Sequence, residues 1–230
     1  MTRASTPCRL ALLPLAISLA STPAALAAGF QLGDVQGQFD SELSIGVSWA
    51  MEDLLDDYIH PTNGGEASAR TSDDGHLNFE KGDVFSNVFK GVHDLELRYG
   101  DSGMFVRGKY WYDFETKDRG QRFYAIDDDG RDPLQKSSGV ALLDAFVYHN
   151  YFIGQNPGNI RLGRQVVSWG ESLFVGNSIN SINPIDVSAF RRPGAEVKEG
   201  LIPIEMIYLS QGLTQNLSAE LFYQLKWAPS

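Results

Sequence analysis

Apolar and polar side chains alternate from Phe39 with unusual regularity. One face of this run is mostly apolar and comprises Phe39, Ser41, Leu43, Ile45, Val47, Trp49 and Met51. The other face is polar or small and comprises Gln38, Asp40, Glu42, Ser44, Gly46, Ser48 and Ala50. A repeat of two residues predicts a β-strand with one apolar face. Its length of about a dozen residues exceeds the usual five or six of a soluble strand and suits a tilted membrane crossing.

The same alternation predicts six further strands. They fall at residues 93–99, 104–115, 142–153, 159–169, 202–210 and 217–227. The connections alternate between short turns of roughly four to six residues and loops of roughly 25 to 40, far above the usual median of about five. The long loops are residues 51–90, 116–139 and 170–201. Outer-membrane barrels have short periplasmic turns and long external loops. A soluble antiparallel sandwich would explain the alternation, but not the strand lengths or the loop rhythm.

The predicted fold is therefore all-β, an antiparallel up-and-down transmembrane β-barrel. About seven strands is an odd number, whereas single-chain bacterial barrels have an even one. The end, Trp227-Ala228-Pro229-Ser230, also lacks the terminal aromatic residue that usually closes such a barrel. We expect an incomplete barrel, its N-terminal portion, from a truncated gene or a partial record. An open edge strand in lipid leaves backbone groups unpaired, so the chain alone should aggregate, be degraded or pair with another chain.

The N-terminus predicts export. Arg3 and Arg9 precede an apolar run, Leu10 to Ala20, and Ala25-Leu26-Ala27 supplies the small residues of a cleavage site. We expect residues 1–27 to be a signal peptide and residues 28–230 to be the barrel portion, located in the outer membrane after crossing the periplasm. A single membrane anchor is the alternative, but the apolar run is short. The only cysteine, Cys8, leaves with the signal peptide, so the mature chain has no disulfide framework.

Composition and motifs exclude several function classes. The net charge is -10, and an acidic chain is a poor match for nucleic acid. The mean hydropathy of -0.21 is too polar for a bundle of membrane helices. Gly170-Glu171-Ser172-Leu173-Phe174 lacks the second glycine of a nucleophile elbow. The four histidines show no metal spacing, and Asp127-Asp128-Asp129-Gly130 is followed by Arg131 where a calcium loop needs a ligand. We expect no enzyme, no cofactor and no metal site.

Charges on the strands point to the barrel interior. Tyr110, Tyr112 and Phe114 alternate with Lys109 and Asp113. A Lys or Arg on the lipid side at mid-membrane costs roughly 2 to 4 kcal/mol, so the charged face should line the lumen. The inward set is then Asp94, Glu96, Arg98, Arg107, Lys109 and Asp113, with Asp144 on a following strand. Such residues can line a wet channel or form a structural ladder of salt bridges, and both interpretations stay open.

The loop after Trp169 is too apolar for a solvated connector. It contains Ile179, Ile182, Ile185, Val187 and Phe190. We expect it to fold back over or into the barrel mouth. 

This loop also predicts a short helix. Asn183 can cap a helix that starts at Pro184, with Asp186 in the first turn and Pro193-Gly194 after its end. Arg191 and Arg192 would lie at its C-terminus and could pair with Asp144 or Asp113. The candidate lumen or gating residues are Arg107, Lys109, Asp113, Asp144, Asp186, Phe190, Arg191 and Arg192. The loop could act as a solute gate or merely as a plug.

Several short motifs resemble one family. They are Gly37-Gln38-Phe39-Asp40-Ser41, Lys109-Tyr110-Trp111-Tyr112-Asp113, Leu143-Asp144-Ala145-Phe146-Val147, the run from Arg161 to Ser172 and Ile182-Asn183-Pro184-Ile185-Asp186. With these motifs the mature chain resembles the family called domain of unknown function 1302, whose members are longer exported proteobacterial proteins of a barrel type. Because such members are often encoded near exporters of lipids or hydrophobic compounds, the resemblance implies a transport role.

The functional expectation is an outer-membrane channel or exit duct for a small, hydrophobic or amphipathic solute. Its partners would be outer-membrane lipid, that solute and periplasmic or inner-membrane export components, with no nucleic acid. One alternative is a structural or surface-interaction barrel whose long loops bind partners. Another is a non-functional truncated fragment. An outer-membrane lipid enzyme is the weakest of the alternatives.

Overall fold

A single antiparallel sheet dominates the computed structural model, which describes residues 17–20, 24–68, 74–123, 127–169 and 182–227. All seven predicted strands are present, and each pairs with the next. They are β3 (Val35–Trp49), β4 (Val84–Tyr99), β5 (Ser102–Asp113), β6 (Ser138–Ile153), β7 (Asn156–Gln165), β8 (Ile204–Thr214) and β9 (Leu217–Gln224). The up-and-down order is confirmed. The sheet is not closed, because among the described residues β9 pairs only with β8.

Two further strands extend the sheet beyond β3. These are β1 (Ile17–Ala20) and β2 (Ala24–Leu32), which both pair antiparallel with β3. The β2–β3 turn contains Gly33 with φ of 62°, a left-handed conformation that favours glycine. Strand β2 crosses the cleavage site expected after Ala27, so the signal peptide stays a prediction.

Several strand boundaries differ from the prediction, and two of them depend on contacts with other parts of the chain. Strand β4 begins at Val84, because the alternation continues through Ser86 and Lys90, polar residues that are buried against other parts of the chain. Strand β7 ends at Gln165, before Trp169. The Asn183 side chain takes over there, accepting a hydrogen bond from Val167 N at 3.0 Å and donating to Gln165 O at 3.4 Å. A long-range side chain therefore ends the strand.

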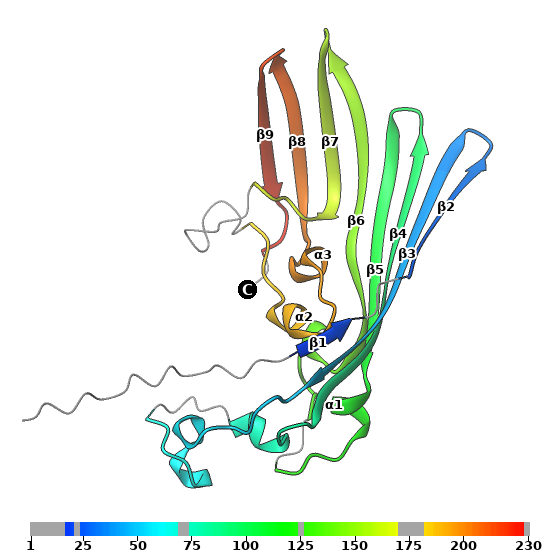
Figure 1. Cartoon of the computed structure of the whole chain (residues 1–230). Coiled ribbons are helices and arrows are strands. Elements are labelled where there is room, and N and C mark those ends of the chain that lie inside the picture. The colour runs from blue at the N-terminus through cyan, green and yellow to red at the C-terminus, as the bar shows by residue number, and fades with distance from the viewer. Residues whose placement is uncertain (1–16, 21–23, 69–73, 124–126, 170–181, 228–230) are drawn as a thin grey trace, which may run out of the picture.

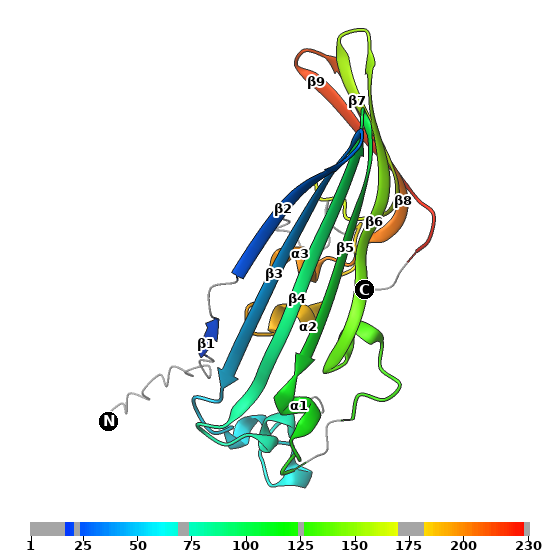
Figure 2. The ribbon, with the colours of Figure 1, turned by 90° about the vertical axis from the view of Figure 1, so that its right-hand side faces the viewer.

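The sheet curves around two short helices (Figure 1). They are α2 (Val187–Arg191) and α3 (Val197–Gly200), and both views place them on the same face of the sheet (Figures 1 and 2). The tight turns lie at one end of the strands and the long loops at the other. The loop end carries α1 (Phe114–Asp118) and the 3-10 helices η1 (Asp56–Tyr58), η2 (Pro61–Asn63), η3 (Asp74–Asn78) and η4 (Pro133–Gln135). Among the described helices, none has the length and apolar character needed to span a membrane.

The two faces of the sheet have opposite polarity. On the face that α2 and α3 cover, Lys90 and Lys109 are only 4% and 2% exposed. On the other face, Ile45 is 49% and Val140 81% exposed. The exposed apolar set there also includes Phe39, Leu43, Phe89, Met104, Leu142, Val147, Ile160, Leu162, Ile207, Leu221 and Tyr223. A soluble sheet protein hides its apolar face, so this arrangement is the reverse of the usual one.

A smaller apolar cluster lies beneath the returning loop. Val167, Ile204, Met206 and Tyr208 are buried, and Ile182 and Phe222 pack against them. The cluster fixes the chain as it leaves β7 and as it enters β8, which positions the two helices between those points.

Candidate functional site

Arg107 is the centre of an ion-pair ladder across three strands. Its guanidinium forms a bidentate pair with Asp94 on β4, with Nε–Oδ1 of 2.7 Å and Nη2–Oδ2 of 2.6 Å. Its Nη1 lies 3.6 Å from Asp144 Oδ2 on β6. Bidentate geometry of this kind fixes the guanidinium plane as well as its position. Arg107, Asp94 and Asp144 thus meet across the sheet, and the lumen expected on their face stays a prediction.

The segment of residues 182–203, here called the plug segment, folds back against the charged face of the sheet. Lys90 Nζ pairs with Glu199 and donates to Gly194 O at 2.5 Å. Lys109 Nζ lies 3.7 Å from Asp186 Oδ2 and 3.4 Å from Glu199 O. These four charged side chains are all at most 7% exposed. Residues 182–203 therefore fold back onto the sheet, with strand lysines holding carboxylates of the plug segment, while the barrel mouth stays a prediction.

A third, more exposed pair holds the edge of the plug segment. Lys198 Nζ lies 2.6 Å from Glu42 Oε2 on β3 and 2.9 Å from Glu196 Oε2. The Lys198 and Glu42 side chains are 32% and 17% exposed. Water therefore screens this pair more than the lysine pairs deeper in the site.

The expected pairing of the plug arginines with Asp144 or Asp113 is wrong. Arg192 donates to the carbonyl oxygens of Leu134 at 2.8 Å and Lys136 at 3.1 Å, and its guanidinium lies 4.6 Å from the centroid of the Trp111 ring. Backbone carbonyls of the neighbouring loop, invisible in a residue pattern, supply the partners. Arg191 is exposed at the end of α2.

Asp113 has a different role from the one expected. Its Oδ1 caps α1, accepting hydrogen bonds from Glu115 N at 3.0 Å and Thr116 N at 3.3 Å. Its Oδ2 accepts from Ser86 Oγ at 2.8 Å. The carboxylate is thus satisfied where β5 ends and α1 begins, and it faces β4 across the sheet.

The plug helix starts three residues later than predicted. Asp186, not Asn183, is its N-cap, and Asp186 Oδ1 accepts from Ala189 N at 3.0 Å. Asn183 is instead the side chain that terminates β7 and donates to Ile202 O at 3.0 Å. Asp186 also faces Lys109, so one carboxylate both starts the helix and joins it to the sheet.

The apolar residues of this loop divide between two environments. Ile182 packs on the buried cluster, whereas Ile185, Val187 and Phe190 are 45%, 56% and 44% exposed. The Phe190 ring occupies the space beside Gly200 that any larger side chain would need, which joins α2 to α3. Ile179 lies outside the described residues, as does the Gly170–Phe174 motif.

Sequence reasoning missed three residues of the site. Lys90 fell inside a region read as a loop, and Lys198 and Glu199 carried no motif. The available signal was the continuation of the two-residue alternation back through Lys90, which places it in phase with Asp94. For Lys198 and Glu199 the local sequence gave no comparable signal.

Two of the histidines pair with serines on neighbouring strands. Ser41 Oγ lies 2.8 Å from His93 Nδ1, and Ser102 Oγ lies 2.9 Å from His149 Nδ1. His93 stacks between aromatic rings, 5.8 Å from Phe39 and 5.5 Å from Tyr110 between centroids. Each serine is directly opposite its histidine in the sheet. These are cross-strand pairs of the apolar face.

The acidic run Asp127–Asp129 is folded around internal partners. Asp128 is buried and accepts hydrogen bonds from Ser137 N at 3.0 Å and Lys117 Nζ at 3.1 Å. The Ser137 hydrogen bond, followed by that from Lys117, lowers the pKa of Asp128 below its ordinary value. One oxygen from each of the three carboxylates lies within 4.8 Å of the others. The lysine supplies charge compensation for Asp128.

Fold and site together define a class: an up-and-down antiparallel sheet with an apolar exposed face, whose charged face is covered by a returning segment held by buried ion pairs. The chain belongs to the family described as "Protein of unknown function (DUF1302)", whose model matches residues 8–230. No curated protein and no solved structure gives a match.

Proposed function

We propose that this chain forms the wall and the plug segment of an outer-membrane channel, an exit duct for a small hydrophobic or amphipathic solute. The observation that carries the proposal is the reversed polarity of the sheet. Exposed residues such as Ile45 and Val140 suit contact with lipid, while Lys90 and Lys109 point to the covered face. A lysine on a lipid face costs roughly 2 to 4 kcal/mol, so this orientation favours a membrane with the charged face as lumen.

The charged face supports a passage that can be opened. The plug segment is held through Lys90–Glu199 and Lys109–Asp186, contacts that can break without disturbing the backbone pairing of the sheet. A plug segment joined to the sheet by backbone strand pairing could not move without disturbing that pairing. In the proposed duct, the plug segment moves aside as solute passes, and export components of the periplasm or inner membrane deliver the solute.

A second candidate is a structural barrel whose long loops bind partners. The burial of the Lys90–Glu199 pair favours it, because a dry ion pair is costly to separate. In this candidate the plug segment stays in place and only stabilises the sheet.

Conductance in planar bilayers separates the two candidates. We expect the assembled channel, in which this chain forms the wall and the plug segment, to insert and give openings that are rare, and Lys90→Met to make them frequent because Glu199 loses its partner. Lys198→Met is the matched control, since it removes a lysine of the plug segment whose pair with Glu42 on β3 is more exposed. Insertion is checked by protection from protease, which should match that of the native protein. If both variants insert and neither conducts, the structural barrel is supported and the duct is rejected.

A further inference from the structure

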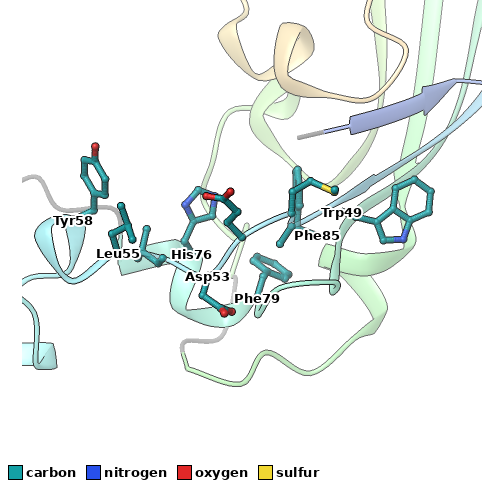
Figure 3. Close-up of a pocket in the computed structure, with 11 residues that line it drawn as sticks. Trp49, Asp53, Leu55, Tyr58, His76, Phe79 and Phe85 are labelled. Carbon is teal, nitrogen blue, oxygen red and sulfur yellow. The ribbon is translucent and has the colours of Figure 1, made fainter. Parts of the chain in front are cut away.

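A cavity of about 130 Å³ lies at the loop end of β3 and β4, away from the plug segment. Its walls are mostly apolar and include the rings of Trp49, Tyr58, His76, Phe79 and Phe85. Tyr58 lies at one end of the group and Trp49 at the other, with His76, Phe79 and Phe85 between them (Figure 3). Phe79 and Phe85 meet edge to face, with centroids 6.1 Å apart and an interplanar angle of 61°.

Backbone hydrogen bonds fix the loop around this cavity. Ala50 N donates to Asp83 O at 2.9 Å and Gly82 N donates to Ala50 O at 2.7 Å, which closes the base of the loop. Lys81 N donates to Asp53 Oδ1 at 2.8 Å across the loop. These hydrogen bonds therefore hold the loop around the cavity in place before any ligand binds.

Charge decides which ligand suits these walls. Residues 51–83 contain nine Asp or Glu against two Lys or Arg, and Glu52 and Asp53 are among the residues that line the cavity. The faces of aromatic rings are also negative and attract cations. An anion would be repelled by both features, whereas a neutral apolar molecule would gain from the rings but not from the carboxylates.

We infer that this cavity binds the head group of an apolar organic cation, such as a quaternary ammonium or a protonated aromatic amine. The volume supports a head group, because pockets that hold whole drug-sized ligands measure about 300 Å³ or more. The site is independent of the proposed duct, since its residues come from the loop and the adjoining ends of β3 and β4 and not from the charged face. Its position at the loop end makes it a surface site for a cationic amphiphile.

The decisive probes differ only in charge. Benzyltrimethylammonium and its uncharged isostere neopentylbenzene have the same shape, and benzenesulfonate supplies the anion. We expect calorimetric titration of the detergent-solubilised protein to show binding of the cation, binding of the isostere at least about tenfold weaker, and no binding of the anion. Equal affinity for cation and isostere would overturn the inference and leave an apolar cavity.

Variants test whether the cavity itself is the site. Phe79→Leu keeps apolar volume but removes a ring, and Glu52→Gln removes one carboxylate of the lining. Each should weaken cation binding by about fivefold. Glu66→Gln is the matched control, because it removes the same charge from an exposed position of the same loop outside the lining.

The control should change the affinity for the cation by less than about twofold, because water and salt screen a charge on the surface. If Glu66→Gln weakens binding as much as Glu52→Gln, the attraction is diffuse and the site is rejected. Native protein that binds no cation would also reject it, whether or not the bilayers conduct, and conductance without cation binding would leave the duct standing.

Discussion

The Lys90–Glu199 pair should control the docking of the plug segment. The two side chains are 5% and 7% exposed. Glu199→Gln removes the negative charge beside the buried Lys90 ammonium, which then has only neutral acceptors there, the Gly194 carbonyl among them. Removing one partner of a buried pair costs about 3 to 5 kcal/mol, because the other charge stays in a dry site. We expect this cost to fall on docking, since the backbone pairing of the strands is unchanged.

Limited trypsin digestion measures the docking free energy. Arg191 ends α2 and is exposed, but cleavage after it requires the helix to open. When cleavage is slow relative to closing, its rate follows the open population. At about 1.4 kcal/mol per factor of ten, Glu199→Gln should speed cleavage by about a hundredfold to several thousandfold, up to the limit of a fully undocked segment.

Two controls test whether the burial of the Lys90–Glu199 pair sets the docking cost. Glu42→Gln breaks the partly exposed pair with Lys198 on the same segment, and should cost less than about 1 kcal/mol. Lys90→Met combined with Glu199→Leu removes both charges and should recover most of the docking, with a coupling energy of about 1 kcal/mol or more. The reasoning is refuted if Glu199→Gln is cleaved no faster than Glu42→Gln. It is also refuted if the docking costs of Lys90→Met and Glu199→Leu, measured singly, add up to the cost of the double change.

Three further predictions concern topology, acid stability and the plug arginines. A cysteine at exposed Asp129 should react with an impermeant maleimide on intact cells and one at Asp101 should not; the opposite result would reverse the orientation. The lowered pKa of Asp128 contributes stability that is present above its unfolded pKa of about 3.9 and is lost as the pH falls through the folded value. The melting temperature should therefore depend less steeply on pH below about pH 4 in Asp128→Asn than in the native protein. Arg192→Ala should cost about 1 to 3 kcal/mol in thermal unfolding because it removes two carbonyl hydrogen bonds and a ring contact, whereas exposed Arg191→Ala should cost almost nothing; equal effects would contradict the packing.

Strands β3 to β9 and their order could be predicted from the sequence alone, whereas β1 and β2 could not. A repeat of two residues is a local property of the backbone, so alternation around Phe39, Tyr110 and Leu221 identified strands and the exposed face of each. The short and long connections then fixed an up-and-down order. The inward placement of Arg107 and Lys109 followed from the same alternation.

Only the tertiary structure decided which charges meet. Lys109 and Asp186 lie far apart in the chain, and Lys90 meets Glu199 across a sequence separation of 109 residues. Alternation assigns a face but not a partner, because partners depend on where the returning segment docks. The end of β7 was decided in the same way, since the Asn183 side chain competes there with the strand ladder for backbone groups.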